Sequence, residues 1–216
     1  MRVLENCEPK QVFYYFEEIC KIPHGSRNTK QISDYLVAFA KEHDFDYVQD
    51  EMNNVIIYKP ATPGYENAPT VILQGHMDMV CEKRPDVQHD FEKDGLNLSV
   101  KDGYVTANGT TLGGDDGIAV AYALALLDST DLPHPALEVL ITVDEEIGLL
   151  GAVGLDCSVL KGKTYDQYGL RSRGQPLDQL CRWTFCCQPY PGCTRRRRRR
   201  KTSDKSMRPD GWSFRF

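Results

Sequence analysis

Apolar and polar residues recur along the first 160 residues with two periods, one typical of helices and one typical of strands. Apolar residues three or four positions apart predict amphipathic helices over 9–21 and 28–43. Pro9 suits the first turn of the earlier helix, where a missing backbone N–H costs nothing. An almost wholly apolar stretch predicts a third, buried helix over 117–128.

Shorter apolar runs predict the strands. Residues 47–49 and 54–58 are expected to be strands joined by a turn at 52–54, and 70–74 and 137–143 to be buried strands. Strands that alternate with helices predict an α/β fold, here a three-layer sandwich around a mixed sheet.

The pattern is absent in two places. Residues 82–103 are polar without a period and are predicted to be irregular. From Thr164 onward no period is sustained, so we expect a folded body over 1–163 and a disordered tail over 164–216. Charge changes at the same point, because the body carries 13 Lys and Arg against 27 Asp and Glu, and the tail 13 against 4.

Targeting signals are absent from the chain as given. The N-terminal residues lack the apolar core of a signal peptide, and no later apolar run is long enough to cross a bilayer. We therefore expect a cytoplasmic protein with reduced cysteines and no membrane partner.

Three segments place a His or carboxylates just beyond an apolar run. They are Gln-Gly-His-Met-Asp at 74–78, Gly-Gly-Asp-Asp-Gly at 113–117 and Asp-Glu-Glu at 144–146. A His with several carboxylates suits zinc or manganese, and an adjacent Glu pair can supply one ligand and one general base. The three segments together predict most of a metallohydrolase site.

Each segment alone also has a plainer interpretation. His76 could be an ordinary strand-end histidine, Asp115 and Asp116 could cap a helix, and Glu145 and Glu146 could be a solvated strand end. The combination and order of the segments favour the metal site. The four other histidines lie in loops or at a helix end and are expected to be structural or exposed.

His76 and Asp78 are two positions apart in an extended stretch, so their side chains are expected on the same side of the strand end. One of them could bind a metal while the other orients it.

The body resembles the cytosolic dinuclear-zinc dipeptidases of the aminoacyl-histidine (Xaa-His, non-specific) group. The resemblance is nearly continuous from about residue 10 to residue 163. Its main segments are ICKIPH at 19–24, QGHMDMV at 74–80, GTTLGGDDGI at 109–118 and TVDEE at 142–146.

The resemblance implies a role for each residue of the trio. It makes His76 a terminal ligand of one zinc, Asp115 the carboxylate that bridges two zinc ions, and Glu146 a ligand of the second. Glu145 would be the general base, and Asp78 the partner that orients His76. Manganese or cobalt could replace zinc, and the substrate would be a dipeptide.

The family is also expected to have features that this sequence lacks. Its chains are more than twice as long, dimerise, and carry a lid, a further Asp ligand and a final His ligand. Asp116 stands where Asn is more usual, a change that preserves size. We therefore expect negligible dipeptidase activity from this polypeptide.

The sequence from Tyr165 suggests a frameshift. If the first base of the Tyr165 codon is dropped, synonymous codons for 165–174 allow Met-Ile-Asn-Met-Asp-Ser-Glu-Ala-Glu-Gly. Continuing through Trp183 allows Cys-Ala-Gly-Gly. Both are signatures that the family places after this point, so we interpret the tail as an out-of-frame product.

Two other functions remain open at this stage. One is a non-catalytic zinc-binding remnant. The other is nucleic-acid binding by Arg195–Arg200, six arginines that could contact phosphates. The acidic body and the lack of interleaved aromatic residues argue against nucleic acid as a partner.

Overall fold

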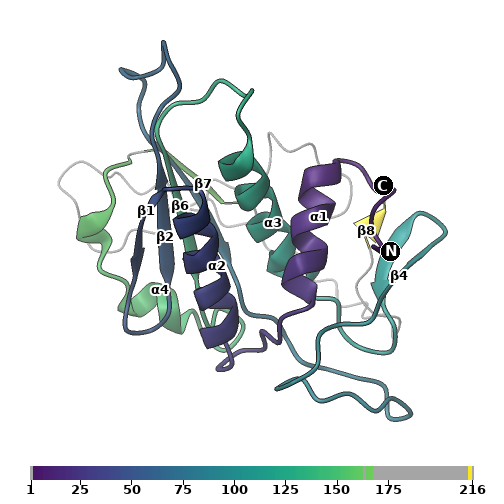
Figure 1. Cartoon of the computed structure of the whole chain (residues 1–216). Helices are drawn as coiled ribbons and strands as arrows, with labels where there is room; N and C mark the ends of the chain where they lie inside the picture. Colours follow the sequence, from purple (N-terminus) through teal and green to yellow (C-terminus); the bar gives the residue numbers. More distant parts are fainter. Residues whose placement is uncertain (1, 163, 168–213, 216) are drawn as a thin grey trace, which may run out of the picture.

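The computed structural model describes residues 2–162, 164–167 and 214–215. Its centre is a mixed sheet in the order β1-β2-β6-β3-β7 (Figure 1). Pairing is antiparallel from β1 to β2 and from β2 to β6, and parallel between β6, β3 and β7. The strands are β1 (Asp46–Gln49), β2 (Val55–Lys59), β3 (Val71–His76), β6 (Leu137–Thr142) and β7 (Thr164–Gln167).

Three helices cover one face of this sheet (Figure 1). They are α1 (Lys10–Cys20), α2 (Lys30–Glu42) and α3 (Gly114–Asp128). Their apolar side chains pack into one core with the sheet, in which Phe16, Ile32 and Leu124 are almost fully buried. Burying this apolar surface is the main force that holds the helices to the sheet.

A shorter segment covers the opposite face. It contains α4 (Leu150–Gly154) and a 3-10 turn, η1 (Cys157–Val159). Ile56, Ile72 and Leu140 form a small second core there with the half-buried Leu155, Val159 and Leu160. The sheet therefore lies between two covering layers, which confirms the predicted α/β fold around a mixed sheet.

Every helix and strand that the pattern predicted is present within a few residues of its expected ends. The prediction of an irregular segment over 82–103 is wrong at its C-terminal end. There β4 (Leu98–Lys101) and β5 (Tyr104–Ala107) form an antiparallel hairpin. Asp102 and Gly103 both have positive φ at its turn, as a two-residue type I′ hairpin loop requires.

The structure describes two short strands in the range expected to be disordered. β7 begins at Thr164 and pairs with β3, and β8 (Phe214–Arg215) pairs with β5. The rest of that range, including Arg195–Arg200, lies outside the described residues. Within the part of the chain that is described, no helix is long and apolar enough to cross a membrane.

Candidate metal centre

The site forms where two parallel strands end side by side. His76 is the last residue of β3 and pairs in register with Thr142 at the end of β6. The first turn of α3 approaches the same point, because Gly75 has no side chain: a Cβ there would lie 2.9 Å from Asp116 Oδ2. The three segments that the sequence singled out are therefore neighbours in space.

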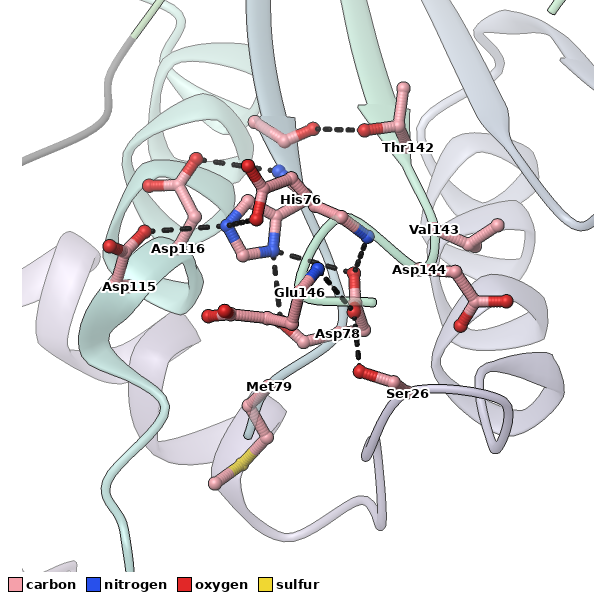
Figure 2. Close-up of polar contacts among 12 residues, drawn as sticks. Ser26, His76, Asp78, Met79, Asp115, Asp116, Thr142, Val143, Asp144 and Glu146 are labelled. Atoms are coloured by element: carbon pink, nitrogen blue, oxygen red, sulfur yellow. Dashed lines mark hydrogen bonds and ion pairs between the residues drawn. The ribbon is translucent and has the colours of Figure 1, made fainter. Parts of the chain in front are cut away.

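The imidazole of His76 lies between carboxylates (Figure 2). Its Nε2 atom is 3.3 Å from Asp115 Oδ1 and 3.8 Å from Glu145 Oε2. Its Nδ1 atom is 2.9 Å from the backbone oxygen of Asp78 and 3.4 Å from Asp78 Oδ1. Asp78 thus contacts one ring nitrogen, which leaves Nε2 directed at the acidic groups.

Three donor atoms are close enough to share one cation. One ligand atom each from His76, Glu145 and Glu146 lies within 4.8 Å of the other two. Asp115 adds a third carboxylate, and a fourth donor residue, through its contact with His76. Imidazole and carboxylate donors are the ligands that zinc and manganese accept, so this donor set fits a divalent metal ion.

Electrostatics support the same interpretation. Burial raises the pKa of Glu146, and the charges of Asp115, Glu145 and Asp78 raise it further against the opposing effect of His76. Burial alone would lower the pKa of His76, but hydrogen bonds to Asp115 and Asp78 outweigh it and raise that pKa to about 11. A bound cation would relieve this crowding of negative charge.

Asp78 is almost fully buried and joins two parts of the site. Its Oδ1 accepts the backbone N–H of Glu145 at 3.0 Å, and its Oδ2 accepts the N–H of Glu146 at 3.4 Å and the Ser26 hydroxyl at 2.8 Å. Burial favours a raised pKa for Asp78, but the hydrogen bonds from His76, Glu145 and Ser26 lower it overall. The side chain is therefore held ionised.

Asp116 belongs to a segment that the sequence placed in the site, but its contacts there were not predicted. The residue is 2% exposed, and its Oδ2 accepts the backbone N–H of His76 at 3.3 Å. Oδ1 has no hydrogen-bond partner among the described residues. Burial, with the charges of Asp115 and Glu145, raises the pKa of Asp116 well above its usual value, against the opposing charge of His76.

Sequence reasoning missed two residues of the loop after α1. The Ser26 hydroxyl donates to Asp78 (Figure 2). The Arg27 N–H donates to Asp144 Oδ1 at 2.6 Å. These contacts join positions 52 and 117 residues apart, so no local pattern could have revealed them.

The fold and the site together define a class of protein. A His and several carboxylates converge at the ends of parallel strands in a mixed α/β sheet, as in a metal-dependent hydrolase.

The matches to known proteins name the family. Residues 72–178 match the model described as "Peptidase family M20/M25/M40". The chain is 44% identical over 155 residues to the cytosol non-specific dipeptidase of Escherichia coli, covering 72% of this chain and 32% of that protein. An uncharacterised Bacillus subtilis protein, YqjE, is 31% identical over 147 residues, covering 66% and 35%.

Solved structures agree with these matches. The aminoacylhistidine dipeptidase of Vibrio alginolyticus superposes with a TM-score of 0.76 at 42% identity, over 77% of this chain and 34% of that one. The aminopeptidase PepT of Bacillus cereus superposes with a TM-score of 0.61 at 25% identity, over 74% and 43%. The chain spans about a third of the length of the curated relatives it matches.

Proposed function

We propose that the described residues form the N-terminal half of a zinc dipeptidase site. The observation that carries this proposal is the convergence of His76, Glu145 and Glu146 donor atoms within 4.8 Å, with Asp115 beside the His76 ring. The His and carboxylate donors fit zinc as the ion. The names of the dipeptidases among the relatives support a dipeptide, Xaa-His or of broader type, as the substrate.

The ligand roles follow from the positions of the donors. His76 would donate from Nε2, because Nδ1 is occupied by Asp78. Glu146 and Asp115 would supply carboxylate oxygens, and Asp115, beside the ring, would be the bridging group in a two-ion site. Bound zinc would polarise the scissile carbonyl and make a water molecule more acidic.

Glu145 would act as general base. Its side chain is one-third exposed and its Oε2 lies 3.8 Å from His76 Nε2, so it borders the cation position and can still meet water and substrate. It would take the proton from the attacking water and pass it to the leaving amine. Its backbone is fixed by Asp78.

We further propose that the 216-residue polypeptide alone hydrolyses dipeptides negligibly, because the Asp and His ligands and the lid expected for the family are not among its residues. We also propose that this protein lies in the cytoplasm, which the name of the Escherichia coli relative supports. We further propose that the full-length members of the family form homodimers. A non-catalytic zinc-binding remnant would keep the same ligands.

An activity assay tests this proposal. Purified chain is incubated with zinc and either Ala-His or Gly-Gly, beside a Glu145→Gln variant that keeps the size of the side chain. We expect no hydrolysis above that of the variant. Zinc-dependent hydrolysis that Glu145→Gln abolishes would show an active enzyme and contradict the predicted inactivity.

A further inference from the structure

The loop that carries Glu145 and Glu146 is closed at its neck. It leaves β6 at Val143 and enters α4 at Leu150. The N–H of Gly151, in the first turn of α4, donates to the Val143 oxygen at 3.0 Å. Inside this closure Leu150 N–H donates to the Asp144 oxygen at 3.1 Å, and Leu149 N–H to the Glu145 oxygen at 3.0 Å. The loop is therefore a compact turn whose shape depends on how its two ends are joined.

The side chain of Asn54 joins both ends. It is 1% exposed, and its Oδ1 accepts the Val143 N–H at 3.0 Å while its Nδ2 donates to the Gly151 oxygen at 3.0 Å. The same Nδ2 donates to Asp50 Oδ2 at 2.7 Å, which fixes the orientation of the amide. A single buried amide thus satisfies a donor at one end of the loop and an acceptor at the other.

The neck is too tight for a larger residue. An added Cβ on Gly151 would collide with Asn54 Oδ1 and with the backbone of Val143. Asn54 reaches this point because it precedes β2, whose first residue, Val55, pairs with Ile141 near the end of β6. The pairing of β2 with β6 therefore places Asn54 beside the two ends of the loop.

We propose that Asn54 is a positioning residue for the metal centre, which sets the place of Glu145 and Glu146 by clamping Val143 to Gly151. It is not one of the donors of the metal centre, and acts through the loop backbone. This inference rests on the proposed zinc site for its consequence, but the clamp itself can be measured without metal.

The test compares three variants. Asn54→Ala removes the clamp, and Gly151→Ala disrupts the same neck from the other side. Glu138→Ala is the matched control: Glu138 is also buried and accepts the N–H groups of Lys161 and Gly162 at 2.9–3.0 Å, but it bridges from β6 to a segment away from the loop. It removes a comparable bond without touching the neck.

Two readouts are needed. The first is backbone amide hydrogen exchange of residues 143–151 in metal-free protein, where Asn54→Ala and Gly151→Ala should speed exchange by about tenfold or more relative to Glu138→Ala. The second is zinc affinity measured by competition with a chromophoric chelator, which both neck variants should lower by roughly 10- to 100-fold, the usual effect of losing support behind metal ligands.

If Asn54→Ala leaves the amide hydrogen exchange of residues 143–151 unchanged, Asn54 does not clamp Val143 to Gly151. Faster exchange with unchanged zinc affinity would overturn its role at the metal centre, as would equal effects from Glu138→Ala. If wild-type chain binds no zinc that depends on His76, the proposed function fails, and the exchange comparison still decides whether Asn54 closes the loop.

Discussion

Asp78 Oδ1 accepts the backbone N–H of Glu145 at 3.0 Å, so the residue that contacts the His76 ring also holds the acidic loop. The carboxylate is buried and its other oxygen is bonded to Ser26 and Glu146. One side chain therefore sets the distance between the histidine and the two glutamates. From the sequence, Asp78 was expected only to orient His76. Its hydrogen bonds to the backbone of Glu145 and Glu146 were not expected.

Replacing Asp78 with Ala should loosen both halves of the site. Because buried N–H groups would lose their acceptor, we expect the free energy of unfolding to fall by about 1–3 kcal/mol and zinc affinity to fall by roughly 10- to 100-fold. Urea unfolding and zinc competition measure the two effects. Asp86→Ala, at an exposed pair with Arg84, is the control and should change neither. Equal results for the two variants would contradict the joining role.

Zinc binding should strengthen as pH rises. The pKa of His76 is raised to about 11 and that of Glu146 is also raised, so both tend to keep protons that a cation must displace. Because binding releases protons, affinity should increase between about pH 6 and 8, by up to about tenfold per unit for each proton released. Calorimetry in buffers with different ionisation enthalpies counts the protons, and a count of zero would refute the expectation.

Lys59 should stabilise the end of α3. Its ammonium group donates to the backbone oxygens of Leu126, Leu127 and Ser129 at 3.0, 2.9 and 2.6 Å. These carbonyls lie at the negative end of the helix dipole, so the loss of the cation leaves them without a donor.

Lys59→Met keeps the aliphatic stem and should lower the free energy of unfolding by about 2 kcal/mol. Lys30→Met is the control, because the ion pair of Lys30 with Asp34 is exposed and should contribute little. Denaturant unfolding of both variants measures the difference. A loss no larger for Lys59→Met than for Lys30→Met would rule out the capping role.

The helices and buried strands could be predicted because their apolar residues follow a helical period or form a continuous run, and the structure contains each of them. Sequence analysis missed the β4–β5 hairpin because each of its strands has only four residues, too few to show a sustained alternation, although Asp102-Gly103 was a readable turn signal. His76 and the acidic residues were predictable because each follows an apolar strand or begins an apolar helix. Asn54 and Ser26 were not, because their roles depend on contacts 89 and 52 residues away along the chain.

The out-of-frame interpretation of the tail makes its own prediction at the nucleotide level. Sequencing the coding region should give codons for residues 165–183 that, with the first base of the Tyr165 codon removed, read Met-Ile-Asn-Met-Asp-Ser-Glu-Ala-Glu-Gly and then Cys-Ala-Gly-Gly. Most of these residues lie outside the described part of the chain, so the test is independent of the structure. Codons that cannot encode those signatures would end this interpretation.

The central claim is that His76 and the carboxylates around it bind zinc. A zinc titration of the purified, untagged chain against a competing chelator tests it, beside His76→Ala and Asp115→Ala, with His134→Asn as a control in a loop outside the site. We expect saturable binding that both site variants weaken at least about tenfold, while His134→Asn leaves it unchanged. Equal affinity in wild type and His76→Ala would contradict it.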